Sequence, residues 1–382
     1  AGGCFWGTEH YMRQLEGVQD TVVGYANGSL ADPSYQEVYT DQTGHVECVK
    51  VVYDEAVVSL NTLCRMFFRS IDPLLLNRQG GDVGTRYRTG IYWVCEEDKE
   101  VVEQVWQEVQ ARFSEPLAVE KRPLKCFYSA EEYHQDYLLK NPEGYCHLSL
   151  ETLNLAKRYS KICRDLRTCS TEEKRDVLPR FFKTGKGEYG EGDRFMGVAV
   201  PDTRKVAKLH KDASYEVLEA LLESEWHEVR LCALVILTER FRKEPEAVVE
   251  FYLRHTEGIN NWDLVDLSAP YILGVYLVDK EDRKILYRLS ESANMWEQRI
   301  SIVSTFVYFL KLGCQFHIAE VVAVHSSCVA VLVTEHTTAA AVHAAITIHI
   351  KNLTDIDTVR NACTAIIAQP CSNTCCLVIA GC

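Results

Sequence analysis

The chain has 382 residues, of which 47% are hydrophobic and 25% charged, and its formal net charge is −13. This length exceeds what one ordinary hydrophobic core organises, so we expect more than one domain. The composition is that of a globular protein. We find no apolar stretch long enough to cross a bilayer and no secretory signal, which excludes a membrane partner from our prediction.

Sixteen cysteines are spread along the chain without the regular spacing of a disulfide framework. Those in apolar runs, such as Cys64 and Cys232, are interpreted as small core residues. We therefore predict a reducing, cytoplasmic location. No Cys and His cluster has ligand spacing, so we expect no bound metal; Cys371, Cys375 and Cys376 are only weak evidence for one.

Residues 1–150 are acidic, with 23 Asp and Glu against 13 Lys and Arg, and they mix two periodicities. Runs of β-branched and aromatic residues between Gly, Asn and Asp predict strands, and apolar residues at helical spacing predict helices. The strands are expected over Thr21–Tyr25, His45–Tyr53 and Thr89–Val94, and the helices over Phe5–Leu15, Leu60–Ser70 and Asp98–Phe113. This mixture predicts an α+β sandwich with helices on a small sheet.

Residues 151–320 lack strand signals and carry one amphipathic helical stretch after another. Trp226, Trp262 and Trp296 recur at separations of 36 and 34 residues, each at the start of such a stretch. A period of this size is typical of an all-α solenoid of stacked helix pairs, although a chance spacing is the alternative. Residues 321–382 carry five charges and six cysteines and are left unassigned.

Cys4 is placed where a sulfur is expected to react. It follows Gly2 and Gly3 and precedes an amphipathic segment, so it stands at a predicted helix N-terminus. Unpaired backbone N–H groups and the helix dipole favour a thiolate there. A structural cysteine below a glycine turn is the competing interpretation.

Glu47 precedes an apolar strand in the sequence Gly-His-Val-Glu, so it is expected at a strand edge near a pocket. A carboxyl kept neutral by apolar walls can donate a proton to an oxygen that leaves a reactive sulfur. Tyr35 and Tyr87 lie in polar, glycine-rich surroundings, where their hydroxyls can hold an oxygen. Taken singly, each tyrosine is interpreted as a surface or capping residue.

Together these residues resemble the A-type peptide-methionine sulfoxide reductases, over residues 1 to about 150. The matching stretches are GCFWGTEHYM, GYANG, PSYQEVYTDQTGHVECVKVVYDE, GGDVGTRYRTGIY and AEEYHQDYLLKNPEGYC. The resemblance implies a ferredoxin-like α/β sandwich that reduces the S epimer of methionine sulfoxide, free or in proteins. It implies no bound cofactor, and recycling by thioredoxin or another dithiol.

The resemblance also assigns roles to residues at the matching positions. Cys4 matches the nucleophile, Glu47 the proton donor, and Tyr35 and Tyr87 the residues that orient the oxygen. The remaining matches are a supporting aspartate, two residues of a methyl-binding wall and a resolving cysteine: Asp82, Phe5, Trp6 and Cys146. One departure is that the strand that normally precedes the Gly-Gly-Cys motif is missing, so we expect a fragment with a weakened sheet.

In the helical stretch, Trp262 precedes Asp266 by four residues, which places an aromatic face and a carboxylate on one side of a helix. With Arg299 one repeat later, such a group can cradle a cationic ring or a distorted nucleic-acid backbone. A core tryptophan with a solvated or capping aspartate is the competing interpretation. Lys183 and Arg194, in a glycine-rich basic loop with Lys186, are candidates for phosphate contacts.

Residues of about 160–320 resemble the DNA alkylation repair family, whose HEAT-like repeats bind damaged DNA. The matching stretches are FFKTGKGEYGEGDRFMGVAVPDTRKVAK, EVRLCALVIL, NNWDLVDLSAPYILG and MWEQRISIVST. Some members excise alkylated bases, and their lesion-contacting residues match Trp262, Asp266 and Arg299. The family's later aromatic has no counterpart, so the last 62 residues are interpreted as an aberrant terminus that truncates the solenoid.

We therefore predict a fusion: a reductase domain at 1–150, a truncated HEAT-like domain at 151–320 and an unassigned tail at 321–382. The expected partners are oxidised proteins, thioredoxin and alkylated double-stranded DNA. The alternatives are a DNA-binding repair protein with an impaired reductase module, and a non-catalytic helical scaffold.

Overall fold

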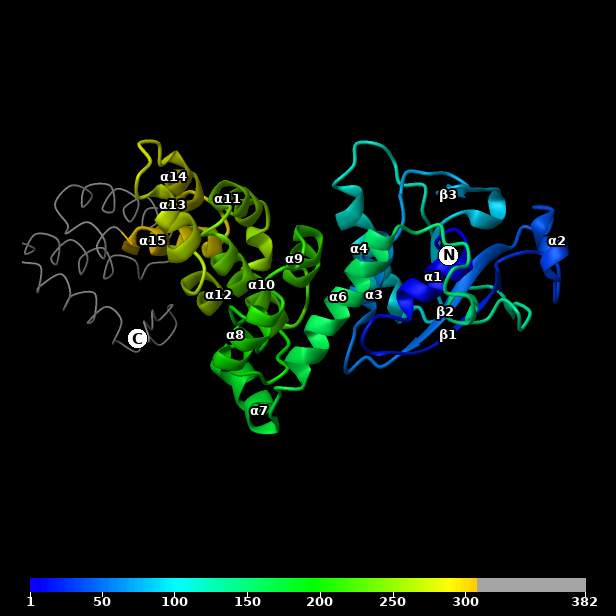
Figure 1. Cartoon of the computed structure of the whole chain (residues 1–382), viewed down its shortest axis with the longest axis horizontal. Helices are drawn as coiled ribbons and strands as arrows, with labels where there is room; N and C mark the ends of the chain where they lie inside the picture. Colours follow the sequence, from blue (N-terminus) through cyan, green and yellow to red (C-terminus); the bar gives the residue numbers. More distant parts are fainter. Residues whose placement is uncertain (308–382) are drawn as a thin grey trace, which may run out of the picture. The chain divides into compact units, whose positions relative to one another are not determined.

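The computed structural model describes residues 1–307, and the tail predicted at 321–382 lies outside this range (Figure 1). Contacts divide the chain into two compact units, of which unit 1 comprises Ala1–Thr168 and unit 2 begins at Cys169. Each unit is described by itself. The division falls after Thr168, beyond the domain boundary predicted at residue 150, because helix α6 belongs with unit 1.

Unit 1 is built on three small sheets. Its strands are β1 (Val18–Ala26), β2 (Val46–Tyr53), β3 (Arg78–Gln79), β4 (Asp82–Val83), β5 (Gly90–Trp93), β6 (Glu120–Pro123) and β7 (Phe127–Ser129). Strands β2, β1 and β7 form an antiparallel sheet in that order, β3 pairs with β4, and β5 runs parallel to β6. Every predicted strand is present, with bounds within three residues of those expected from the side-chain pattern.

The helices of unit 1 pack against these strands or against one another, which gives the predicted α+β class (Figure 1). They are α1 (Phe5–Met12), α2 (Tyr35–Tyr39), the 3₁₀ turn η1 (Thr85–Tyr87), α3 (Leu60–Phe68), α4 (Glu97–Gln110), α5 (Tyr137–Lys140) and α6 (Leu150–Arg167). Serine side chains cap several of their N-termini: Ser59 accepts the Thr62 backbone N–H before α3, and Ser149 accepts that of Thr152 before α6.

Helix α6 is held to the rest of unit 1 by polar contacts at two points along its length. The Ser160 hydroxyl accepts the Glu16 backbone N–H at 2.8 Å. Near the end of the helix, Arg167 donates to Glu16 Oε1 at 3.1 Å and to the Val57 carbonyl at 3.2 Å. These contacts explain why the compact unit extends past residue 150.

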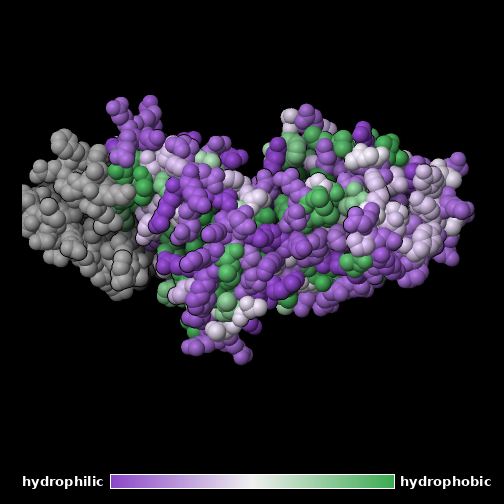
Figure 2. All heavy atoms as spheres, in the orientation of Figure 1, coloured by the Kyte–Doolittle hydropathy of each residue, from purple (hydrophilic) through white to green (hydrophobic). Residues whose placement is uncertain are grey.

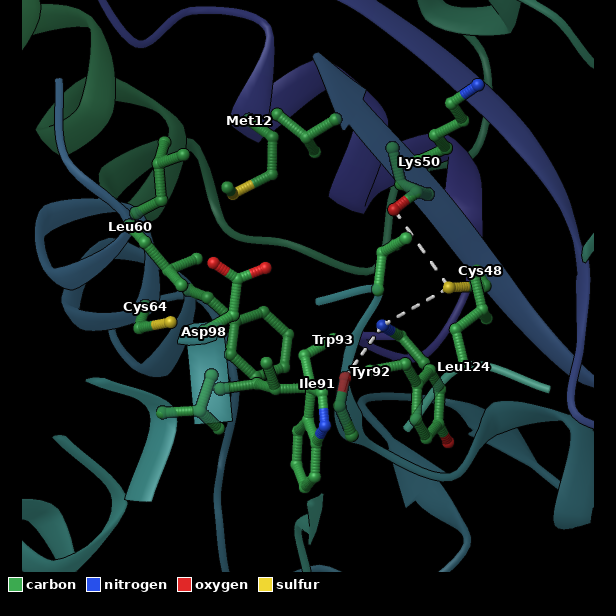
Figure 3. Close-up of a pocket in the computed structure, with 18 of the residues that line it drawn as sticks. Met12, Cys48, Lys50, Leu60, Cys64, Ile91, Tyr92, Trp93, Asp98 and Leu124 are labelled. Atoms are coloured by element: carbon green, nitrogen blue, oxygen red, sulfur yellow. Dashed lines mark hydrogen bonds between the residues drawn. The ribbon is translucent and has the colours of Figure 1, made fainter. Parts of the chain in front are cut away.

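The backbone of the first residue pairs with β5, and its ammonium also lies 3.9 Å from Cys48 Sγ of β2. The Ala1 ammonium donates to the Gly90 carbonyl and the Gly90 N–H donates to the Ala1 carbonyl, both at 2.9 Å. Beside this pair, an apolar cavity of about 220 Å³ lies between β2, α3 and β5 (Figure 3). Cys48, Met12 and Trp93 are among its lining residues. Within residues 1–307, β2 and β5 share no ladder.

Unit 2 is helical throughout its described part. Its elements are α7 (Glu172–Phe181), α8 (Val200–Leu209), α9 (Tyr215–Leu222), α10 (His227–Arg240), α11 (Pro245–Arg254), η2 (Thr256–Gly258), α12 (Trp262–Asp266), the π-helical turn η3 (Pro270–Gly274), α13 (Val275–Leu277), α14 (Lys284–Ser290) and α15 (Met295–Ser304). Helix α10 is buried on nearly all sides and packs against α8 and α9, while α15 packs against α12 and α14. The three periodic tryptophans stand at the starts of α10, α12 and α15, as their spacing predicted.

A buried ionic network lies at the N-terminus of α10. The His227 imidazole is 2% exposed and is held between two carboxylates, Asp263 at 2.8 Å from Nε2 and Asp193 at 3.2 Å from Nδ1. Arg230 donates to Asp193 at 2.7 Å and to Asn260 at 3.0 Å. Burial alone would lower the pKa of His227, but the two aspartates outweigh it and raise that pKa to about 9.

Hydrophilic side chains cover most of the visible face of the molecule, with small apolar patches between them (Figure 2). Within residues 1–307, no helix combines the length and the apolar character needed to cross a membrane.

The pKa of His227 predicts a pH dependence of stability. Because the folded pKa of about 9 exceeds the unfolded value of about 6.5, the contribution is complete below pH 6.5 and is lost as the pH rises through 9. The loss amounts to roughly 3 kcal/mol in the free energy of unfolding. Urea unfolding of the full chain at several pH values measures it, and an NMR titration of His227 with a midpoint below 7 would contradict it.

Candidate active site at the start of helix α1

Cys4 is the N-cap of α1, as predicted, and it is 6% exposed. The turn that places it needs glycine at position 3, where φ is +83° and a Cβ would lie 2.6 Å from the Cβ of Gln79. The Cys4 thiol lies in a cluster of buried apolar and aromatic side chains. Its members are Cys4, Phe5, Val23, Tyr25, Val38, Tyr87 and Ala130, with Trp6, Tyr35 and Val49 packed against them.

The expectation that the helix N-terminus ionises Cys4 is wrong for this site. Burial raises the pKa of the Cys4 thiol well above its usual range, and the nearby carboxyls of Glu47 and Asp82 add to this effect. The backbone N–H groups of Trp6 and Gly7 do favour the thiolate, but less strongly. The desolvation penalty therefore exceeds the helix-terminus effect, and Cys4 is a thiol at neutral pH.

Glu47 lies at the start of β2 and is 2% exposed. Its Oε2 accepts the Phe5 backbone N–H at 3.0 Å, so the carboxyl is tied directly to the first turn of α1. Burial raises the pKa of Glu47 to about 8, although the Phe5 N–H and the Arg86 guanidinium act in the opposite direction. The carboxyl therefore holds a proton at pH 7, as apolar walls predict.

Tyr35 and Tyr87 reach the same cluster from α2 and η1. The Tyr35 backbone N–H donates to Glu131 Oε1 at 2.8 Å, and its ring packs against His134 with centroids 4.7 Å apart. Burial raises the pKa of Tyr35 to about 12 and that of Tyr87 further, with a contribution from Glu47 in both cases. Both hydroxyls therefore remain hydrogen-bond donors at neutral pH.

Two aromatic residues of the first turn line the same region. Phe5 is 1% exposed, and Trp6 stacks on Tyr137 with centroids 3.8 Å apart. The indole Nε1 of Trp6 donates to His134 Nδ1 at 3.2 Å, which fixes the orientation of the indole ring. Sequence reasoning assigned no role to His134 or Tyr137, although both lie in the motif AEEYHQDYLLKNPEGYC.

The segment Tyr145–His147, which precedes α6 in the sequence, lies against the first turn of α1. Tyr145 donates its hydroxyl to Asp82 Oδ2 at 3.0 Å. A Cβ on Gly7 would lie 3.2 Å from Cys146 Sγ and 2.7 Å from His147 Nδ1, so a glycine is needed for this approach. Cys146 is a free thiol in this structure. Sequence reasoning missed His147, whose only signal was its place next to Cys146.

The structure also brings together the residues predicted to contact a DNA lesion. Asp266, at the end of α12, forms a two-pronged ion pair with Arg299 of α15, at 3.0 and 2.7 Å. Trp262 is half-buried and stacks on Phe182 with centroids 5.4 Å apart. Burial raises the pKa of Asp266 despite its pairing with Arg299.

Two of the three residues predicted to contact phosphate have partners within unit 2. Arg194 donates to Glu225 at 3.1 Å and lies over the Trp226 ring at 4.3 Å. Lys183 lies 3.9 Å from Glu188. Arg194 therefore already has a carboxylate and an aromatic partner within unit 2, whereas the ion pair of Lys183 is long.

Known proteins match the two units separately. The sequence profile of peptide methionine sulfoxide reductase matches residues 1–164, and that of DNA alkylation repair enzyme matches residues 162–323. The peptide methionine sulfoxide reductase MsrA of Mycoplasma pneumoniae is 51% identical over 150 residues, which cover 39% of this chain and 96% of that protein. That of Clostridium botulinum strain Hall is 52% identical over 151 residues, 40% of this chain and 96% of that protein.

Solved structures also match part of the chain. The crystal structure of Mxr1 from Saccharomyces cerevisiae in reduced form is 39% identical, covers 39% of this chain and 88% of its own, and gives a TM-score of 0.38. Methionine sulfoxide reductase A of Corynebacterium diphtheriae is 37% identical, covers 38% and 74%, and gives 0.35.

The chain therefore belongs to the peptide methionine sulfoxide reductase family through its first 164 residues, and a DNA alkylation repair domain follows. Its N-terminal domain is a methionine sulfoxide reductase.

The raised pKa of Cys4 predicts slow alkylation at neutral pH. We expect the rate of Cys4 modification by iodoacetamide to rise with pH and to reach its midpoint above pH 9, because only the thiolate reacts. Mass spectrometry of the Cys4 peptide measures this rate, and the exposed Cys95 serves as an internal reference. A Cys4 midpoint below pH 8 would show that the helix N-terminus outweighs desolvation.

Proposed function

We propose that Cys4 and Glu47 of unit 1 reduce the S epimer of methionine sulfoxide, in free methionine or in oxidised proteins. The observation that carries this proposal is a neutral carboxyl, 2% exposed, hydrogen-bonded to the turn that the nucleophile caps. An acid of this kind protonates a weakly basic sulfoxide oxygen more effectively than water does.

In the proposed complex, the substrate methyl group packs against Phe5 and Trp6. The rigid setting of the Trp6 indole, stacked on Tyr137 and bonded to His134, supports this assignment. The hydroxyls of Tyr35 and Tyr87 donate to the sulfoxide oxygen and hold it toward Glu47, since both phenols stay protonated.

The chemical step transfers one oxygen atom from substrate to enzyme. Glu47 gives its proton to the sulfoxide oxygen while Cys4 Sγ bonds to the sulfoxide sulfur, and the thiol proton restores the neutral carboxyl. The oxygen and its proton end on Cys4 as a sulfenic acid, and methionine leaves as a thioether. Asp82, close to Cys4 Sγ, supports the site through its bond to Tyr145.

Cys146 completes the proposed cycle. Its thiol attacks the sulfenic sulfur of Cys4, water leaves, and a disulfide forms between the two cysteines. The position of Cys146 Sγ against Gly7, in the first turn of α1, supports this role. Thioredoxin or another dithiol then reduces the disulfide and returns both thiols.

The pKa of Glu47 predicts the pH profile of the reductase. Because the acid must be protonated, kcat/KM for a methionine sulfoxide peptide is expected to fall as the pH rises through about 8. Glu47→Gln is expected to lower kcat by roughly 10²–10⁴ and to abolish this limb of the profile. Glu55→Gln, an exposed site, is the matched control. If Glu47→Gln keeps the fall of kcat/KM seen in the unmodified protein, that fall belongs to another group.

For unit 2, we infer a HEAT-like helical repeat that binds alkylated double-stranded DNA and excises a cationic base. The favouring observation is that Asp266, held by Arg299, stands one helical turn from the half-buried Trp262. A carboxylate stabilises the positive charge that grows on the sugar as an alkylated base leaves, and an indole face attracts the cationic base itself.

Asp266→Asn is expected to lower the release of a methylated base from duplex DNA by about 100-fold or more, because it removes the charge that stabilises the transition state. Asp279→Asn, an exposed change of the same kind, is expected to have no effect. Chromatography of the released base measures the rate. DNA binding without release in the unmodified protein would instead favour the helical scaffold.

A further inference from the structure

Three potential metal ligands of unit 1 converge at the Cys4 thiol. Cys4 Sγ, a carboxylate oxygen of Asp82 and a ring nitrogen of His147 all lie within 4.8 Å of one another. Over residues 1–307, this is the one group of three or more Cys, His, Asp or Glu ligands with such spacing. Its members come from three separate segments, which is why no local ligand spacing revealed it in the sequence.

The hydrogen bonds of His147 leave one ring nitrogen available. Its Nε2 lies 2.9 Å from the Gly2 carbonyl oxygen, which can only accept, so Nε2 carries the proton. Nδ1 then carries a lone pair, and this buried atom has no hydrogen-bond partner among residues 1–307. Histidines that bind metals commonly have this arrangement, with the second ring nitrogen donating to a backbone carbonyl.

The other ligands are also oriented by the surrounding protein. Tyr145 holds the Asp82 carboxylate through its 3.0 Å hydrogen bond to Oδ2, which leaves Oδ1 for a ligand. Nδ1 of His147 faces Gly7, where a Cβ would lie only 2.7 Å away. The missing side chain at position 7 therefore keeps the space beside Nδ1 open toward the start of α1.

A thiolate, an imidazole nitrogen and a carboxylate oxygen form a ligand set that suits Zn²⁺. Zinc bonds of about 2.0–2.3 Å place neighbouring tetrahedral ligands roughly 3.5 Å apart, so these three groups need to close by about 1 Å. We expect small side-chain rotations to make this change when the metal binds.

We propose that Zn²⁺ binds Cys4, Asp82 and His147 in the reduced protein and reversibly blocks the reductase. The Zn–S bond forms as the Cys4 thiol releases its proton to solvent, with no change in oxidation state, and water fills the fourth position. The metal occupies the sulfur that must attack the sulfoxide. Zinc binding itself goes beyond the proposed function, because it can be measured whether or not the reductase turns over.

Zinc binding is tested on the full chain, reduced with a phosphine and stripped of metal. Titration against a chromophoric chelator is expected to show one more zinc equivalent in the unmodified protein than in Cys4→Ser, whatever other cysteines bind. His147→Gln and Asp82→Asn are expected to weaken this equivalent by about tenfold or more. Cys95→Ser, at an exposed cysteine, is the control and is expected to match the unmodified protein.

Two further readouts separate ligation from a loss of folding. Co²⁺ in place of Zn²⁺ is expected to give a sulfur-to-cobalt charge-transfer band that Cys4→Ser loses, while circular dichroism shows that the variant stays folded. Zinc is also expected to stop a single round of sulfoxide reduction, and EDTA to restore it.

Equal zinc binding by the unmodified protein, Cys4→Ser and His147→Gln would overturn the zinc site. A protein that binds zinc as expected but never reduces a sulfoxide would instead refute the proposed reductase chemistry and leave the zinc site standing.

Discussion

The hydrogen bond between Glu47 and the Phe5 backbone N–H joins the acid of the site to the turn that carries its sulfur. The protonation of the site depends on the burial of this pair. The same desolvation keeps the proton on the carboxyl and on the Cys4 thiol, so the empty site holds two neutral acids rather than an ion pair. A thiol of this kind is protected from adventitious oxidation until a sulfoxide arrives.

A few short secondary-structure elements of unit 1 bury this site. Glu47 lies on strand β2, and Cys4 caps helix α1. The short elements α2 and η1 carry Tyr35 and Tyr87. Glycines at positions 3 and 7 let the backbone and the Tyr145–His147 segment approach closely. Unit 2 differs in that the buried His227 and the partly buried Asp266 each have an ionic partner. Its ionic pairs are accordingly expected to set its response to pH.

Much of unit 1 could be predicted from local pattern. Strand alternation predicted β1, β2 and β5, helical spacing predicted α1, α3 and α4, and the glycine turn predicted the N-cap position of Cys4. The shorter elements of unit 1, such as β3, β4 and α5, were not predicted, because two to four residues are too few to show a period. The ionisation of Cys4 was predicted wrongly, because a helix terminus is visible in the sequence but the depth of burial is not. His147 was missed for a similar reason: its ring reaches Gly2 only through tertiary packing. The boundary of unit 1 lies beyond residue 150 because Arg167 of α6 contacts residues distant in the sequence, which the local pattern does not show.

The most direct test of the proposed reductase mechanism follows the oxygen atom. The reduced protein is mixed with one equivalent of a methionine sulfoxide peptide, without added reductant, and Cys4 is analysed by mass spectrometry. We expect a Cys4–Cys146 disulfide in the unmodified protein and a trapped Cys4 sulfenic acid, with one methionine formed, in Cys146→Ser. Formation of methionine with Cys4 and Cys146 both still reduced would contradict it.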